Sequence, residues 1–390
     1  MDLITKFMNL FAPPTLLTAL FFLLPPLYFF KLFLSFLSSL FPEDMLHKVV
    51  LITGASSGIG EQMAYQYAKK GACLVLVARR ESSLLEVAKR AQELGSPDVL
   101  VLPADVAKPE ECRRFIDATL SHFGRLDHLV NNAGIANLCM FEEAEDVTNF
   151  MPVLDVNFWG SIYPTYFALP HLKQTRGRIV VNSSSSGWLP MPRMSFYNAS
   201  KAALINFFET LRIEFGHEIG ITIATPGWIE SEMTQGKFLS KEGRMVVDQE
   251  LRDVQVGLFP VSYSEDCAKA IVNSACRGDR YVIEPSWFKG LYLWRVFAPE
   301  VLDWLYHFVY VTKPGTPTSE MPSKIMLEAI SGAKEVLVPS SILTGSNWPG
   351  TSRGLRRMCQ GHCNQCMSRR AIRDRAMVVQ GAVPMESVCA

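Results

Sequence analysis

A short apolar segment that runs directly into a glycine-rich turn constrains the fold of this chain more than any other feature. The β-type run Val49-Val50-Leu51-Ile52 is followed at once by Thr53-Gly54-Ala55-Ser56-Ser57-Gly58-Ile59-Gly60. A helical pattern at 61–70 and a second apolar run at 74–77 come next. This order of strand, glycine turn, helix and strand is the βαβ unit of a parallel sheet. We therefore predict one doubly wound α/β domain, a Rossmann sheet with helices on both faces, over about residues 42–285.

The glycine turn predicts a binding site for the diphosphate of a dinucleotide. Glycines let backbone N–H groups approach phosphates, and the following helix presents its positive N-terminal end. An NAD site would place a carboxylate about 20 residues later for the ribose 2′-hydroxyl. This chain has Ala78-Arg79-Arg80 there, and two guanidinium groups fit a 2′-phosphate, so NADP(H) is predicted rather than NAD(H). The alternative is that one arginine is a solvated charge at a helix start.

Tyr197 and Lys201 form the second informative pattern. They are four residues apart in Tyr197-Asn198-Ala199-Ser200-Lys201, so on a helix a phenol and an ammonium project from one face. A phenol titrates near pH ~10 in water and is a poor acid at neutral pH until a nearby cation stabilises its phenolate. The pair is therefore typical of proton exchange with an alcohol or carbonyl oxygen, although the same spacing is common on ordinary helix surfaces.

Taken together, the motifs resemble those of the short-chain dehydrogenase/reductase family. They are Thr53 to Gly60, Asn131-Asn132-Ala133-Gly134, Asn157, Ser184, Tyr197-x-x-x-Lys201 and Pro226-Gly227, in this order over roughly residues 47–285. Within the family, the chain is most similar to 11β-hydroxysteroid dehydrogenase-like enzymes. Its apolar N-terminus and its Trp287-Phe288-Lys289 region are similar to those of plant steroleosins of seed oil bodies. The resemblance implies an NADP-dependent hydroxysteroid dehydrogenase and a homodimer.

The resemblance also implies the roles of the catalytic residues. Tyr197 would be the general acid and base, and Lys201 would lower its pKa and hold the nicotinamide ribose. Ser184 would bind the substrate oxygen, with the register within the four serines 183–186 left open. Asn157 would anchor a proton-relay water near the lysine.

The cofactor site implied by the resemblance spans the glycine turn, the two arginines and the ends of later strands. Asp105 would contact the adenine, and Pro226-Gly227 would lie near the nicotinamide, with Ser231 nearest to the usual threonine. Asn131 and Asn132 are explained equally well as ties between strand ends. The full set is Gly54, Ser56, Ser57, Gly58, Ile59, Gly60, Arg79, Arg80, Asp105, Val106, Asn131, Asn132, Ala133, Gly134, Tyr197, Lys201, Pro226 and Gly227.

Residues 1–41 form an apolar segment with no charge between Lys6 and Lys31. A segment of this length would ordinarily be one membrane-spanning helix. Pro13-Pro14 and Pro25-Pro26 instead divide it into arms of roughly 16 Å, about half of a ~30 Å hydrocarbon core. We therefore expect a hairpin anchor in a lipid monolayer or membrane, similar to the steroleosin proline knob, with a single kinked helix as the alternative. A cleaved signal peptide is disfavoured, because no small-residue cleavage site follows.

Two sequons indicate which side of the membrane the enzyme faces. Asn182-Ser183-Ser184 and Asn198-Ala199-Ser200 both lie within the catalytic motifs, where a glycan would obstruct the site. The nine cysteines, an odd number, agree with a reducing compartment. We expect a lipid droplet (oil body) or endoplasmic reticulum membrane location, with the catalytic domain in the cytosol.

Large apolar residues near the tyrosine indicate a lipid-like substrate, and by resemblance a steroid or sterol. A retinol or ketoacyl-lipid reductase, and a mainly structural oil-body coat protein, are the alternatives. A formal net charge of zero gives no reason to expect a nucleic-acid partner. The apolar residues are Trp188, Leu189, Met191, Met194 and Phe196, then Trp228, Met233, Phe238 and Phe259.

Two further segments follow the predicted domain. Residues 286–331 carry apolar side chains at near-helical spacing on both sides of Pro299, which predicts either an amphipathic lid or membrane contact, or packing against a partner subunit. Residues 332–390 contain arginines and cysteines with almost no apolar pattern and are predicted to be disordered. Cys359, His362, Cys363 and Cys366 lack a second knuckle, so no metal site is predicted.

Overall fold

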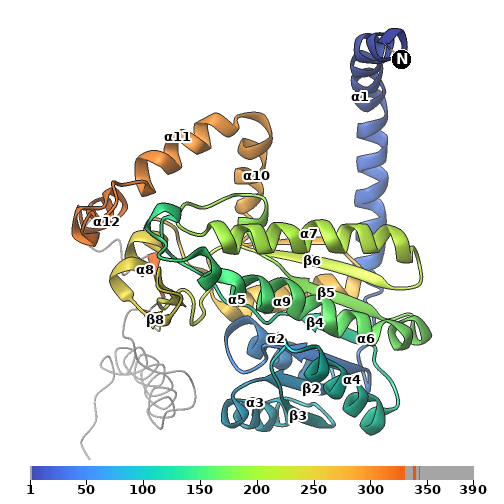
Figure 1. Cartoon of the computed structure of the whole chain (residues 1–390). Helices are drawn as coiled ribbons and strands as arrows, with labels where there is room; N and C mark the ends of the chain where they lie inside the picture. Colours follow the sequence, from blue (N-terminus) through green and yellow to red (C-terminus); the bar gives the residue numbers. More distant parts are fainter. Residues whose placement is uncertain (1, 330–336, 340–341, 343–390) are drawn as a thin grey trace, which may run out of the picture. The chain divides into compact units, whose positions relative to one another are not determined.

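A parallel sheet forms the centre of the structure, a computed structural model that describes residues 2–329, 337–339 and 342. Its strands run in the order β3-β2-β1-β4-β5-β6-β9, and every neighbouring pair is parallel (Figure 1). The strands are β1 (Val49–Thr53), β2 (Cys73–Ala78), β3 (Val99–Pro103), β4 (His128–Asn131), β5 (Arg178–Asn182), β6 (Gly220–Pro226) and β9 (Tyr281–Glu284). The strands predicted at 49–52 and 74–77 are confirmed.

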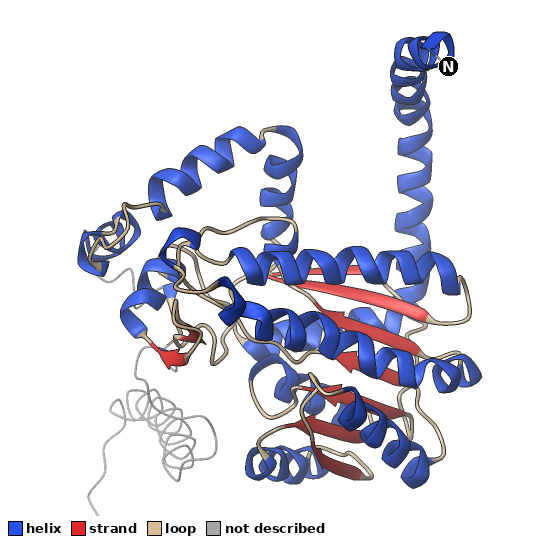
Figure 2. Ribbon diagram, viewed as in Figure 1, coloured by secondary structure: helices blue, strands red, loops and turns tan. Residues whose placement is uncertain are grey.

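Helices cover both faces of this sheet (Figure 2). One apolar core lies beneath α2 (Gly58–Ala68), α3 (Glu81–Glu93) and α9 (Ser264–Arg277), and the other beneath α4 (Pro109–Phe123), α6 (Gly160–Thr175) and α7 (Ser195–Phe215). Alternate residues of each strand enter opposite cores, which is why the strands read as continuous apolar runs. The predicted doubly wound α/β class is confirmed.

A third apolar cluster lies around Tyr197, at the carboxyl ends of the strands. It joins the loops after β4, β5 and β6 to α10 (Phe288–Phe297) and α11 (Pro299–Tyr310). The C-terminal extension, treated as a separate unit in the sequence, therefore shares its buried face with this part of the domain. The remaining elements are β7 (Lys237–Leu239) paired antiparallel with β8 (Met245–Val247), and the short helices α5 (Met151–Leu154), α8 (Gln249–Val256) and α12 (Pro322–Ala329).

The N-terminal segment is one helix, α1 (Asp2–Leu40), and not the two arms expected from its prolines. A proline removes one backbone hydrogen bond and favours a kink, which need not end the helix. The hydroxyls of Thr15 and Thr18 donate to the carbonyls of Phe11 and Pro14 beside the first proline pair, at 2.6 and 2.8 Å. Within the described residues, α1 contains one stretch long and apolar enough to cross a membrane, with a mean hydropathy of 1.8 and exposed side chains.

The arginine- and cysteine-containing tail predicted at 332–390 lies outside the described residues, except for 337–339 and 342. The predictions about Cys359, His362, Cys363 and Cys366 therefore stay predictions. The cysteines in the described part of the chain are free and buried; they are Cys73, Cys112, Cys139, Cys267 and Cys276.

A polar network around Glu43 lies at the amino ends of β1, β4 and β5. The Glu43 carboxylate is 2.5 Å from the Lys48 ammonium and 3.3 Å from Nε2 of the fully buried His128. The Tyr67 hydroxyl lies 3.0 Å from Nδ1 of the same ring. Burial lowers the pKa of His128, whose two ring nitrogens face the Tyr67 hydroxyl and the Glu43 carboxylate. Burial alone would raise the pKa of Glu43, but the bonds to His128 and Lys48 lower it to about 2.

Glu43→Gln should reduce stability in a pH-dependent way. A carboxyl whose folded pKa lies below its unfolded value stabilises the fold above pH 4.5, and this stabilisation is lost as the pH falls toward about 2. We expect the variant to lower the free energy of unfolding by about 2 kcal/mol at pH 7 and by much less at pH 3. Urea unfolding of the full chain in detergent measures both values, with the exposed Glu214→Gln as control. An equal loss of unfolding free energy at both pH values would contradict the lowered pKa assigned to Glu43.

Candidate active site

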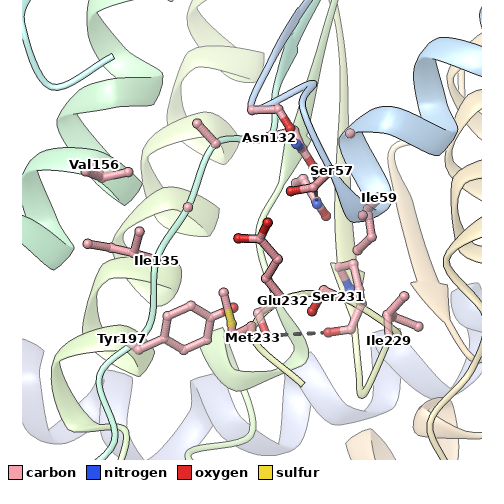
Figure 3. A pocket seen from close by; sticks show the side chains of 18 of the residues that line it. Ser57, Ile59, Asn132, Ile135, Val156, Tyr197, Ile229, Ser231, Glu232 and Met233 are labelled. Atoms are coloured by element: carbon pink, nitrogen blue, oxygen red, sulfur yellow. Dashed lines mark hydrogen bonds between the residues drawn. The ribbon is translucent and has the colours of Figure 1, made fainter. Parts of the chain in front are cut away.

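One cavity of about 400 Å³ extends from the glycine turn to Tyr197 at the carboxyl ends of the strands (Figure 3). Parallel strands bring their following loops to this edge, where ligands bind in doubly wound sheets. Most of the predicted site residues lie on its wall. They are Gly54, Ser56, Ser57, Gly58, Ile59, Gly60, Arg79, Arg80, Asp105, Val106, Asn132, Ala133, Gly134, Ser184, Tyr197, Lys201, Pro226 and Gly227.

The glycine turn is formed by backbone that other residues would not adopt. Gly54 and Gly58 have φ angles of +64° and +60°, in the left-handed region that favours glycine. A Cβ at Gly60 would lie 2.3 Å from the carbonyl oxygen of Gly54. α2 begins at Gly58, so its N-terminal N–H groups are at the cavity. This shape fits the diphosphate of a dinucleotide, which must approach the backbone closely.

Asn132 fixes the glycine turn to the neighbouring strands. Its amide nitrogen donates to the carbonyls of Thr53 and Gly54 at 3.0 and 3.2 Å. Its amide oxygen accepts from Asn182, at the end of β5, at 2.8 Å. Asn132 thus lines the cavity and also ties strand ends, so both interpretations of this residue from the sequence apply.

Asn131, in contrast, does not line the cavity, which corrects its assignment to the cofactor site. It is buried, and its amide nitrogen donates to the Thr165 hydroxyl of α6 at 2.9 Å. Successive residues of a strand point to opposite faces, so Asn131 and the adjacent Asn132 cannot both face the same ligand.

Tyr197 and Lys201 are brought together on the first turns of α7. Both are buried, and the Lys201 ammonium lies 5.7 Å from the centre of the Tyr197 ring. The ammonium donates to the carbonyl of Asn182 at 2.9 Å, which fixes its direction. Burial lowers the pKa of Lys201 to about 8. Tyr197 itself is oriented through its backbone N–H, which donates to Asn137 at 3.0 Å.

Ser184 is the serine that the structure pairs with Tyr197. Burial raises the pKa of the Tyr197 phenol, and a hydrogen bond with Ser184 opposes the rise. The expected lowering of this pKa by Lys201 stays a prediction. The Ser184 hydroxyl also accepts from the Ser186 N–H at 3.2 Å, whereas the Ser183 hydroxyl turns away to the carbonyl of Lys201 at 2.9 Å. These contacts favour Ser184 within a run whose four serines all line the cavity, and its catalytic role stays a prediction.

Asn157 lies behind the cavity wall, in a π-helical turn between α5 and α6. Its amide oxygen accepts from the Ile135 N–H at 2.8 Å, and its amide nitrogen donates to the Ile135 carbonyl and the Ser200 hydroxyl, both at 2.9 Å. Its backbone carbonyl accepts from Ser161 at 3.0 Å. In the structure, Asn157 therefore fixes Ile135 against α7, and the expected relay role stays a prediction.

The far end of the cavity carries the two arginines predicted for the ribose phosphate. Arg80 donates to the hydroxyls of Ser56 and Ser57 at 3.2 and 2.9 Å, and it also bonds to Glu232. Asp105, at the end of β3, accepts from the Ala107 N–H at 3.1 Å and lines the cavity beside them. These residues could hold the adenosine end of a dinucleotide, where Arg80 and the two serines offer hydrogen-bond donors.

Several wall residues were not predicted. Glu232 and Lys237 come from the segment after β6, and Phe288 comes from α10. The Phe288 ring closes over Gly227, where a Cβ would lie 2.3 Å from the ring. No local pattern identifies Glu232 and Phe288, because each contacts a distant segment at the cavity, Arg80 and Gly227 respectively.

Comparisons with known proteins agree with this geometry. Residues 48–242 match the family described as short chain dehydrogenase. The chain is 58% identical over 342 residues to "11-beta-hydroxysteroid dehydrogenase A" of Sesamum indicum, with 88% of this chain and 98% of the relative covered. It is 57% identical over 344 residues to "11-beta-hydroxysteroid dehydrogenase 1A" of Arabidopsis thaliana, with the same coverage.

Solved structures show the same fold. A short chain dehydrogenase/reductase from Burkholderia phymatum in complex with NAD aligns with a TM-score of 0.58 and 24% identity, over 66% of this chain and 96% of that one. An alcohol dehydrogenase from Thermococcus sibiricus complexed with 5-hydroxy-NADP aligns with a TM-score of 0.51 and 26% identity, over 61% and 95%. The chain therefore belongs to the short-chain dehydrogenase family of oxidoreductases.

Proposed function

We propose that this oxidoreductase uses NADP(H) to interconvert hydroxyl and keto groups of a steroid or sterol-like lipid at the surface of a lipid droplet or membrane. The observation that carries the proposal is the convergence of Tyr197, Lys201 and Ser184 at one end of a cavity whose other end is the glycine turn. The names of the plant relatives support the steroid class.

The roles proposed for these residues follow from their bonds and burial. The Ser184 hydroxyl, which donates to the Pro226 carbonyl at 3.4 Å in the structure, would turn to hold the substrate oxygen, and the Tyr197 phenol would exchange the proton with that oxygen. Lys201, directed by Asn182, holds positive charge beside the ring and favours the phenolate. A bound nicotinamide would accept or supply the hydride. Because burial raises the pKa of Tyr197, its protonated form suits carbonyl reduction near neutral pH, and alcohol oxidation should become faster as the pH rises.

An apolar wall beside Tyr197 supports a lipid-like substrate. Leu189, Met191, Met194, Trp228 and Phe288 line this part of the cavity. Thioether and aromatic side chains accept a rigid apolar ring system well and offer few hydrogen bonds to a sugar.

The cytosolic orientation is supported by the two sequons. The amide nitrogen of Asn182 bonds to Asn132, and that of Asn198 donates to the Met191 carbonyl at 2.8 Å. Neither nitrogen is available to carry a glycan in the folded domain. The free, buried cysteines agree with a reducing compartment.

Tyr197→Phe should abolish turnover while leaving the cofactor site intact. We expect kcat for a hydroxysteroid to fall by at least about 100-fold, since proton transfer loses its donor, with little change in the Kd for NADP⁺. The assay uses the full chain in detergent, a hydroxysteroid panel and both nucleotides, with the exposed Tyr166→Phe as control. If the wild-type chain binds nucleotide but oxidises no steroid, the sterol assignment fails. Other lipid alcohols are then the next substrates to test.

Arg79→Asp should reverse the cofactor preference. The new carboxylate would repel a 2′-phosphate and accept from a ribose 2′-hydroxyl, so the ratio of kcat/KM for NADP⁺ to that for NAD⁺ should fall by at least about tenfold. Arg90→Asp, on the exposed side of α3, makes the same charge change away from the cavity. An unchanged ratio would argue against the proposed phosphate site.

Charges placed in α1 should release the protein from lipid. Each aspartate costs about 3 kcal/mol in a hydrocarbon environment, so Leu20→Asp with Leu23→Asp should prevent stable insertion. Flotation with phospholipid-coated triacylglycerol droplets measures this, and Leu20→Ile with Leu23→Ile is the matched control. Equal flotation of both variants would show that α1 is not the anchor.

A further inference from the structure

Glu232 lies in a hydrogen-bonded turn, and its side chain points into the cavity (Figure 3). The turn follows β6 and is closed by the Thr234 hydroxyl, which donates to the Ile229 carbonyl at 2.9 Å. It is also closed by the Lys237 N–H, which donates to the Glu232 carbonyl at 3.0 Å. The direction of the carboxylate is thus set by backbone and short polar side chains.

Two cations hold the Glu232 carboxylate. Lys237, from the same turn, donates to one oxygen at 2.7 Å, and Arg80, from the end of β2, donates to the other. Burial alone would raise the pKa of Glu232, but the bonds to Lys237 and Arg80 outweigh it and lower the pKa. The side chain is therefore an anion, with about a fifth of its surface exposed (22%).

The Arg80 guanidinium divides its donors between Glu232 and the glycine turn. One nitrogen bonds to the glutamate, and the other donates to the hydroxyls of Ser56 and Ser57. Serine hydroxyls and arginine are the groups that bind phosphate. An anion of the protein thus already occupies part of the cluster that the proposed function assigns to the 2′-phosphate of NADP(H).

We infer that Glu232 is a specificity-determining residue that competes with the ribose 2′-phosphate for Arg80. The inference rests on the proposed NADP(H) preference. When the phosphate binds at Ser56 and Ser57, Arg80 turns to it, and Glu232 keeps Lys237 as its partner. Only a ligand that offers two negative charges at this point replaces the glutamate well, so a nucleotide without the phosphate leaves the Arg80–Glu232 pair in place.

Equilibrium binding tests this without any turnover. The probes are adenosine 2′,5′-bisphosphate and 5′-AMP, which differ by the 2′-phosphate, added to the full chain in detergent. Isothermal titration calorimetry reports binding. We expect Glu232→Gln to tighten the Kd for the bisphosphate by about fivefold and the Kd for 5′-AMP by less than about twofold.

Two further variants separate competition from a general charge effect. Glu230→Gln makes the same charge change two residues away, at a side chain that does not line the cavity, and should leave the Kd for the bisphosphate unchanged. In an Arg80→Ala background, Glu232→Gln should no longer improve bisphosphate binding, because the shared partner is gone.

The outcomes distinguish the inference from the proposed function. If the wild-type chain binds both probes equally, the NADP(H) preference fails and the inference falls with it. If the wild type prefers the bisphosphate, but Glu232→Gln changes the Kd for both probes by the same factor or raises the Kd for the bisphosphate, the NADP(H) preference stands. The competition between Glu232 and the phosphate for Arg80 is then overturned.

Discussion

The hydrogen bonds of Asn132 join parts of the site that come from distant regions of the chain. Its amide nitrogen donates to the carbonyls of Thr53 and Gly54, and its amide oxygen accepts from the side chain of Asn182. The carbonyl of Asn182 in turn accepts from Lys201. A continuous chain of hydrogen bonds therefore runs from the glycine turn across the sheet edge to α7. Since a buried acceptor left without a donor costs about 1–3 kcal/mol, these bonds fix the nucleotide end and the catalytic end relative to each other.

The parts of the fold that depend on neighbouring residues could be predicted from the sequence. The apolar run before the glycine turn determines β1, the turn and α2, and the two-faced burial of the strands follows from their uninterrupted apolar character. Tyr197 and Lys201 share a helix face because of their spacing alone. This local information was sufficient for the doubly wound class, the glycine turn and the Tyr197–Lys201 pair, whereas most of the remaining cavity wall was expected from the resemblance to the family.

The parts that depend on contacts between distant segments could not be predicted. Nothing beside Phe288 in the sequence indicates that its ring covers Gly227, and nothing beside Glu232 indicates its arginine partner across the cavity. Asn131 and Asn132 are identical neighbours, and the register of β4 alone decides which of them faces the ligand. The prolines of α1 predict helix ends, but a proline removes one backbone hydrogen bond and the rest of the helix continues.

The network around Glu43 joins the end of α1 to one edge of the sheet. Glu43 follows α1 in the chain and is held by groups at the amino ends of β4 and β5, while Tyr197 and Ser184 lie at the carboxyl ends. A force transmitted through α1 would therefore enter the domain at the edge of the sheet opposite the reacting groups, with the length of the parallel strands between the two edges.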